Sequence, residues 1–143
     1  VCLGNDGFSN AMWDEWKATY LLHKIHALDP RKKNGLTVTQ MAIYNNAALA
    51  DVFFPEAKVG QLTVGAAADI IFVDYHSPTE LTAGNLPWHI LFGFQSDLVT
   101  TTIVAGNVLM KDRVLLTLDE AEIAAKARES SAKTWKRYNA QFQ

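Results

Sequence analysis

The first part of the chain has the apolar spacing of an amphipathic helix. Between residues 11 and 28, large apolar side chains recur every three or four positions, at Trp13, Trp16, Tyr20, Leu21, Ile25 and Leu28. This period predicts a helix with one apolar face. Ser9 or Asn10 can serve as its N-cap, and Asp29-Pro30 should end it, because the residue before a proline disfavours helical geometry.

A second helix is predicted from a capping-box pattern at Thr37-Val-Thr-Gln40. The Thr37 hydroxyl can accept a hydrogen bond from the backbone N–H of Gln40, and the Gln40 side chain can reach back. The helix should run over about 38–50. Its inward-facing residues are expected to be Val38, Met41, Ala42 and Leu49.

A final helix is predicted to follow a second capping box, Thr117-Leu-Asp-Glu120, and to reach about Asn139. Opposite charges four residues apart support a helix. The segment offers two such pairs, Glu122 with Lys126 and Glu129 with Lys133.

Strand patterns occupy the start of the chain and the stretch between the second and final helices. Val1–Leu3 and the β-branched run 68–74 read as strands, and 99–104 with 108–110 reads as a hairpin followed by a short strand at 114–116. Asn85–Gly93 reads as a loop that leads into a short apolar segment. An unpaired apolar strand at the N-terminus is a liability. Its best partners would precede Val1, so the pattern favours the C-terminal portion of a longer protein.

Composition narrows the classes of partner. The 143 residues are 49% hydrophobic and 20% charged, with a net charge of -2, which suits one compact domain or pieces of two. No stripe of Lys and Arg appears, and Arg31-Lys32-Lys33 is expected to be a solvated turn, so neither nucleic acid nor an anionic membrane is expected as a partner. No apolar run is long enough to span a membrane. The single cysteine, Cys2, cannot form an internal disulfide, so a reduced, cytoplasmic setting is the default, with Cys2 buried as a small hydrophobe.

Asp6 is the first candidate for chemistry. It lies between Gly4 and Gly7, just past the end of the predicted Val1–Leu3 strand. Barrels of alternating strands and helices keep their catalytic groups at such strand ends, and flanking glycines permit an unusual turn. The alternative is a plain turn in which Asp6 bonds its own backbone. Spacing alone leaves both interpretations open.

The four histidines give weaker signals. His23 and His26 are three residues apart on the first predicted helix and could share a metal, although surface positions are the simpler interpretation. His76 and His89 follow strand or loop positions and could contact a substrate or serve as structural hydrogen-bonding groups. The sequence has no His-x-His, His-Glu-x-x-His or Cys-x-x-Cys pattern.

Five segments together resemble a known family. "LGNDG" before an aromatic-rich helix is similar to the eighth-strand segment of metal-dependent amidohydrolases, in the branch of cytosine deaminase-like and triazine hydrolase-like enzymes. "MAIYNNAAL", "VGQLTVGAAADIIFVD" and "VTTTIVAGNVLMKDRVLL" resemble later segments of these enzymes in the same order, and the Gly-x-x-Ala-Asp stretch is the most specific. With "NLPWHILFGF", the pattern is most similar to aminohydrolases linked with selenium metabolism.

The resemblance implies an α/β fold: the end of a TIM-like (β/α)8 barrel, part of a small β-sandwich and a final helix. Residues 1–55 would hold the last barrel strand and closing helices, residues 56–118 the C-terminal half of the sandwich, and residues 119–143 the helix packed outside. The family hydrolyses C–N or C–Cl bonds of small cyclic substrates with a water activated by zinc or iron. The family's aspartate role, metal ligand and proton acceptor, carries over to Asp6.

Departures from the family pattern limit that implication. Asn5 stands where Thr or Ser is common, and Ile43 and Asn46 stand where Thr and Gly are usual; Asn5 and His89 remain weak candidates for substrate contact. The family's histidine and glutamate ligands would all precede Val1, so we expect the chain alone to bind no metal and to be inactive. We also expect self-association through exposed barrel and sandwich surfaces. The alternative is a stand-alone, non-catalytic β-sandwich or oligomerisation module that kept the fold.

Overall fold

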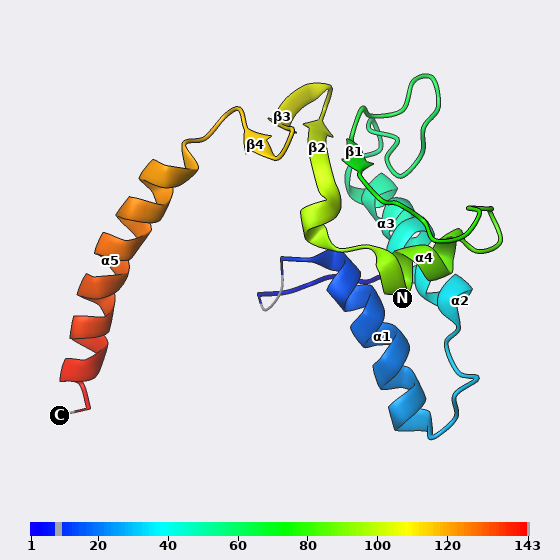
Figure 1. Ribbon diagram of the computed structural model, residues 1–143, viewed down its shortest axis with the longest axis horizontal. Helices are drawn as coiled ribbons and strands as arrows, with labels where there is room; N and C mark the ends of the chain where they lie inside the picture. The colour runs from blue at the N-terminus through cyan, green and yellow to red at the C-terminus, as the bar shows by residue number, and fades with distance from the viewer. Residues whose placement is uncertain (8–9, 143) are drawn as a thin grey trace.

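A helical body forms around the N-terminal half of the chain. The computed structural model describes residues 1–7 and 10–142. The helices of the body are α1 (Met12–Ala27), α2 (Gly35–Thr39), the π-helical η1 (Gln40–Asn45), α3 (Asn46–Phe53) and α4 (Leu86–Gly93). Segments α2, η1 and α3 follow one another without a break, so that they form a single rod beside α1 (Figure 1).

The core of this body is small and lies where three helices meet. Trp16 of α1, Val38 of α2 and Leu91 of α4 are buried and in contact, and Leu3 packs against them from the N-terminal segment. Tyr20 adds edge-to-face contacts with the rings of Trp88 and Phe92, whose centroids lie 5.9 Å and 5.4 Å away. Residues more than 70 positions apart in the sequence therefore build the same core.

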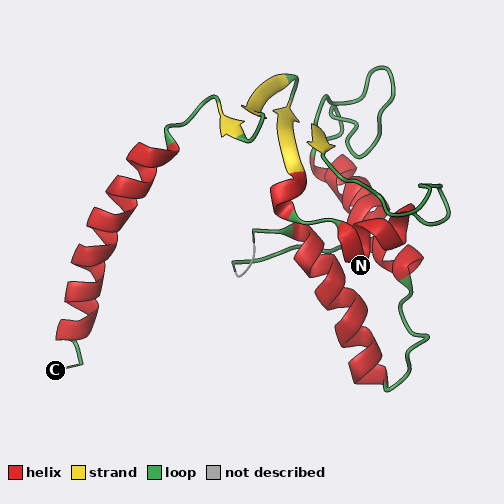
Figure 2. Ribbon diagram, viewed as in Figure 1, coloured by secondary structure: helices red, strands yellow, loops and turns green. Residues whose placement is uncertain are grey.

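A four-stranded antiparallel sheet adjoins the helical body (Figure 2). Its strands are β1 (Ile70–Val73), β2 (Val99–Val104), β3 (Asn107–Lys111) and β4 (Val114–Leu115), and they are neighbours in the order in which they occur in the chain. A single-turn 3-10 helix, η2 (Ser96–Leu98), leads into β2. The predicted strand at 68–74 and the predicted hairpin are therefore confirmed.

The Gly-x-x-Ala-Asp stretch has a structural role in this sheet. The Asp69 carboxylate accepts a hydrogen bond of 2.7 Å from the backbone N–H of Ala105, in the turn between β2 and β3. The backbone N–H of Gly106 donates to the carbonyl of Ala68 at 3.0 Å. Ala105 and Gly106 both have positive φ, at 48° and 79°, as a tight hairpin turn requires. The most specific sequence signature thus holds a hairpin in place.

The last helix, α5 (Glu120–Ala140), extends away from the rest of the molecule (Figure 1). None of its residues is buried. Both predicted ion pairs are present, with Lys126 Nζ 2.5 Å from Glu122 Oε1 and Lys133 Nζ 2.6 Å from Glu129 Oε1. Among the described residues, no helix combines the length and the apolar character that crossing a membrane would need.

Neither capping box forms. Asn34 caps α2, because its side-chain oxygen accepts from the backbone N–H of Thr37 at 3.0 Å. Asp119 caps α5 by accepting from the backbone N–H of Glu122 at 2.9 Å. In both cases an Asn or Asp lies near the predicted threonine and competes for the same role. Ala11 occupies the N-cap position of α1 without a side-chain bond, so Asn10 is not the cap, and Ser9 lies outside the described residues.

Four further predictions of local structure are wrong. Val1–Leu3 is not a strand, because no neighbouring strand is present among the described residues to pair with it. Cys2 is exposed rather than buried. Leu49 is 46% exposed, since the π-helical segment before it changes the register of the helix faces. Residues 86–93 form α4, a helix whose second residue is Pro87, instead of a loop.

Candidate active site

Asp6 lies on a turn with strained backbone geometry. Its φ is 45°, in the left-handed region, and the residue is exposed. Neither Gly4 nor Gly7 has such a φ, and in the part of the chain that the structure describes, chain neighbours aside, a Cβ added to either would meet no atom within 4 Å. The unusual backbone conformation that the glycines were expected to permit is therefore adopted by Asp6 itself. Aspartate is among the few residues that tolerate this region, and such strain often marks functional sites.

The segment before this turn is held by two asparagine side chains. Asn46 accepts from the backbone N–H of Leu3 at 2.9 Å and donates to the Leu3 carbonyl at 2.7 Å. The Asn45 side chain donates to the Val1 carbonyl at 2.6 Å, and the backbone carbonyl of Asn45 accepts from the Cys2 thiol at 3.3 Å. These side chains replace the neighbouring strand that the sequence pattern implies for Val1–Leu3. Asn45 and Asn46 are consecutive in the sequence, but nothing in the local pattern specifies Val1 and Leu3 as their partners.

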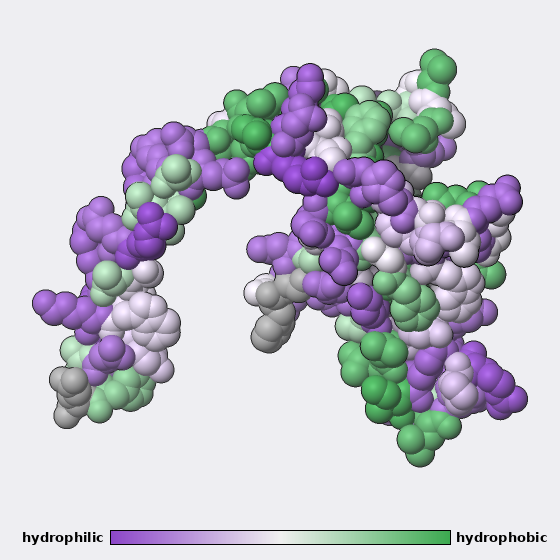
Figure 3. Space-filling model, viewed as in Figure 1, coloured by the Kyte–Doolittle hydropathy of each residue, from purple (hydrophilic) through white to green (hydrophobic). Residues whose placement is uncertain are grey.

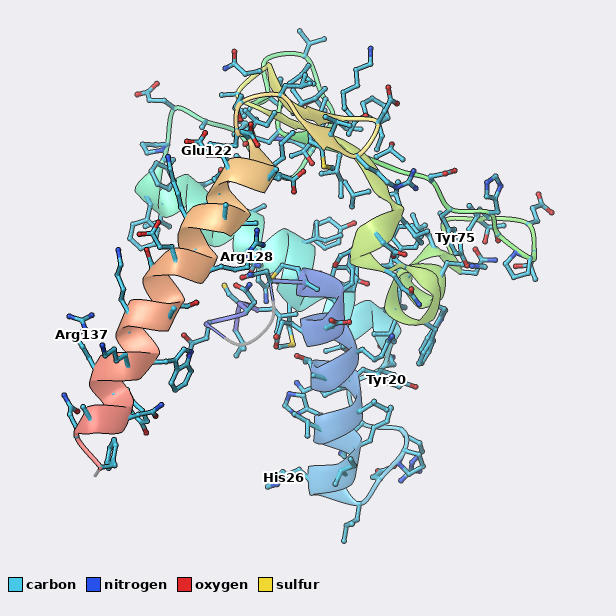
Figure 4. The ribbon with its side chains drawn as sticks, turned by 60° about the vertical axis from the view of Figure 1, so that its left-hand side comes forward. Tyr20, His26, Tyr75, Glu122, Arg128 and Arg137 are labelled. Carbon is cyan, nitrogen blue, oxygen red and sulfur yellow. The ribbon has the colours of Figure 1, made fainter. Side chains whose placement is uncertain are left out.

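The histidine pair on α1 does not form a metal site. His23 and His26 are both exposed, and His26 points away from the other elements at the end of the helix (Figure 4). Asp29, at the same spacing, is paired with Arg31, whose Nε lies 3.0 Å from Asp29 Oδ1. This hydrogen bond to the Arg31 guanidinium lowers the pKa of Asp29 below its usual value. Asp29 therefore stabilises the loop after α1.

His89 has hydrogen-bond partners at both ring nitrogens. Its Nδ1 lies 2.8 Å from the hydroxyl of Tyr75, and its Nε2 lies 3.2 Å from Oγ1 of Thr79. A cavity of about 310 Å³ adjoins these groups and is lined by Tyr75, Trp88, His89, Phe92 and Gly93. The contacts tie α4 to the segment after β1, so in this structure His89 has the geometry of a structural residue.

A larger cavity lies between the helical body and the sheet and was not expected from the sequence. It has a volume of about 530 Å³, and its lining is mainly apolar: Met12, Trp13, Trp16, Ala42, Ile43, Asn46, Ile71, Val73, Ile90 and Phe94. Protein interiors are normally close-packed, so the two layers are incompletely packed among the described residues. The polar side chain of Asn46 lines this cavity and also bonds the backbone of Leu3.

Comparison with known proteins places these observations in a family. The chain is 39% identical over 119 residues to the 5-methylthioadenosine/S-adenosylhomocysteine deaminase of Thermococcus onnurineus (strain NA1), a match that covers 80% of this chain and 27% of that protein. It is 32% identical over 144 residues to the 5'-deoxyadenosine deaminase of Methanosarcina barkeri, covering 98% of this chain and 32% of that protein. No family model matches the chain.

Solved structures show a similar fold. An adenosine deaminase from Xanthomonas campestris with bound zinc aligns at a TM-score of 0.70 and 23% identity, over 85% of this chain and 27% of that one. This chain belongs to the metal-dependent amidohydrolase superfamily. The atrazine chlorohydrolase of Arthrobacter aurescens TC1, complexed with zinc, shares the fold at a TM-score of 0.53 and 22% identity, over 80% of this chain and 25% of that one. The small α/β unit with its four-stranded sheet matches the C-terminal quarter of these amidohydrolase chains.

The amidohydrolase chain supplies one candidate metal ligand. It spans only about a third of the length of the two relatives above, or less. Among residues 1–7 and 10–142, no group of three His, Cys, Asp or Glu side chains could hold a metal ion. The exposed Asp6 carboxylate is a donor of a type that zinc accepts, but the described residues do not by themselves complete a zinc site.

Proposed function

We propose that this chain acts as the C-terminal part of a metal-dependent hydrolase that removes an amino group from a small cyclic substrate. The observation that carries the proposal is the strained, exposed Asp6, which follows a segment anchored to the core, in a chain similar to deaminases over most of its length. Asp6 is the proposed metal ligand and proton acceptor. Asn5 remains a weak candidate for substrate contact.

The same proposal assigns a place to each region. Residues 1–55 would close a TIM-like barrel, residues 56–118 would form part of a composite β-sandwich, and residues 119–143 would pack outside. Exposed apolar side chains support this assignment. They occur on the sheet and near the end of α1, where Figure 3 shows hydrophobic surface, at Ile71, Phe72, Val108, Leu22, Ile25 and Leu28. Such surfaces normally have a partner. When no such partner is present, we expect copies of the chain to self-associate through these apolar surfaces.

The chemistry proposed for the whole enzyme needs a metal ion. A bound divalent metal lowers the pKa of a water molecule and so makes a nucleophile available near neutral pH. Zinc is favoured over iron, because the similar solved structures named above contain zinc. The remaining ligands would come from residues outside this chain, so the chain alone is expected to be inactive and free of stoichiometric metal.

The substrate class follows from the relatives' names. The two relatives are deaminases of adenosine derivatives, so we favour an adenosine-like substrate whose exocyclic C–N bond is hydrolysed to release ammonia. Cleavage of a C–Cl bond is less favoured, because the chlorohydrolase likeness is one of fold. The second candidate function is a non-catalytic module, which the absence of a three-ligand group among the described residues favours. A cytoplasmic setting remains an expectation.

One experiment separates the two candidates. The complete reading frame that encodes these residues is determined and its product is purified. Bound zinc is then measured, together with ammonia release from 5'-deoxyadenosine and 5-methylthioadenosine. An upstream His-x-His, one zinc per chain and ammonia release would support the hydrolase. A reading frame that starts beside Val1, with no zinc and no turnover, would support the module.

A further inference from the structure

Asn46 makes an unusual pair of contacts for a helical side chain. Its amide group bonds both backbone polar groups of Leu3, at 2.9 Å and 2.7 Å. This is the pattern by which one strand pairs with the next, here supplied by a single side chain. Asn46 and Leu3 are both partly buried, and Leu3 also packs against the core around Trp16. The contact is therefore partly sheltered from competing water, which raises the cost of losing its hydrogen bonds.

The π-helical segment η1 ends at Asn45 and directly precedes Asn46, so its geometry sets the direction of both side-chain amides toward the N-terminal segment. A π-helix adds a residue to the helical turn, shifts the faces of the residues that follow, and often occurs at functional sites. Gln40 and Asn45 are the first and last residues of η1, and Gln40 Nε2 donates to Asn45 Oδ1 at 3.0 Å. This bond orients the Asn45 amide so that its nitrogen donates to the Val1 carbonyl. The side chains of Asn45, at the end of η1, and Asn46, which follows it, therefore bond the backbone of Val1 and Leu3.

Leu3 matters because it precedes the Asp6 turn by only three positions. Gly4 comes next, and glycine has the greatest backbone freedom of any residue. Among the described residues, chain neighbours aside, no atom would lie within 4 Å of a Cβ at Gly4. The Asn46 hydrogen bonds therefore fix Leu3, the point from which the chain continues through Gly4 toward Asp6.

We propose that Asn46, oriented by η1 and assisted by Asn45, is a positioning residue that fixes the start of the turn carrying Asp6. This proposal rests on the function proposed for Asp6. Asn46 itself touches no reacting group. Its role is to hold a ligand-bearing turn within the small tolerance that catalysis permits, since a displacement of about 1 Å can cost roughly a hundredfold in rate.

The test uses the product of the complete reading frame and three variants. Asn46→Leu removes both hydrogen bonds, and Asn46→Asp keeps the acceptor and loses the donor. Asn85→Leu is the matched control, because Asn85 also bonds two backbone groups, the Thr82 N–H and the Glu80 carbonyl, both at 2.8 Å. For each protein, hydrogen–deuterium exchange of the peptide covering residues 1–5 is measured together with kcat and KM.

Asn46→Leu should speed exchange in that peptide about tenfold. It should lower kcat about a hundredfold with KM nearly unchanged. Asn46→Asp should fall between it and the wild type in both readouts, and Asn85→Leu should change neither. Wild-type exchange at residues 1–5 in Asn46→Leu, or faster exchange with wild-type kcat, would overturn the proposal. If the wild-type protein shows neither zinc nor turnover, the proposed function fails, and the exchange data still decide whether Asn46 fixes the segment.

Discussion

Helices α1 and α5 are stabilised in different ways. α1 inserts Trp16, which is 5% exposed, into a core shared with Val38 and Leu91. α5 is longer, at 21 residues, and has no buried residue. It is supported by the Asp119 cap and two ion pairs within the helix. α1 therefore depends on residues far away in the sequence, whereas α5 depends on its neighbours, and this difference can be tested residue by residue.

The largest expected effect comes from removing a tryptophan from each helix. Trp16→Ala should lower the free energy of unfolding by about 3–5 kcal/mol, because it opens a cavity in a small core. Trp135→Ala in α5, where the side chain is 60% exposed, should change it by less than about 0.5 kcal/mol. Urea denaturation followed by circular dichroism measures both. Equal effects would show that α5 is packed as tightly as α1.

The next effect probes the contact of α4 with the segment after β1. A Cβ on Gly93 would lie 2.6 Å from the Tyr75 hydroxyl. Gly93→Ala should therefore destabilise the protein by about 1–3 kcal/mol and disturb the bond between Tyr75 and His89. Gly84→Ala is the control, since its nearest atom would be Thr82 Oγ1 at 3.8 Å. A stable Gly93→Ala variant would contradict the packing described for the helical body.

A smaller effect tests which residue caps α5. Asp119→Ala should cost the helix about 1 kcal/mol, because the backbone N–H of Glu122 loses its acceptor. The loss should appear as faster amide exchange in the first turn of α5, with the helical body unaffected. Thr117→Ala should have no such effect. The reverse result would restore the capping box that the sequence pattern predicts.

The smallest effect concerns the ion pairs of α5. Lys133→Ala removes the partner of Glu129 and should cost about 0.3–0.5 kcal/mol of helix stability. Because both side chains are largely exposed, the effect should shrink as salt is raised from about 0.01 M to 1 M. Amide exchange of residues 126–136 at the two salt concentrations measures it. An effect that is independent of salt would point to packing instead.

Local patterns predicted most of the elements. The extent of α1, the strand at 68–74, the hairpin and the α5 ion pairs follow from spacing and turn chemistry within a few residues. The predicted helix caps were wrong because several polar residues near each helix start could cap it. Only the folded backbone selects Asn34 and Asp119. The prediction that Leu49 faces inward was wrong because an apolar period of 3.6 residues does not reveal a π-helix.

The candidate site was predicted in part. The position of Asp6 between two glycines identified it as a candidate, but its positive φ was not predicted from the sequence. The contact of Asn46 with Leu3 joins residues 43 positions apart, and no local signal specifies such a pair. For His89 the sequence left open a substrate contact or a structural hydrogen bond, and the structure supplies partners for both of its ring nitrogens.

The central claim is that Asp6 takes part in catalysis, and one matched pair of variants tests it most directly. Asp6 and Asp112 are both exposed aspartates with positive φ, at 45° and 50°, and Asp112 lies in the turn between β3 and β4. In the product of the complete reading frame, Asp6→Asn should lower kcat for deamination at least about a thousandfold and reduce bound zinc. Asp112→Asn should leave both unchanged. Wild-type zinc content and turnover in Asp6→Asn would contradict the account.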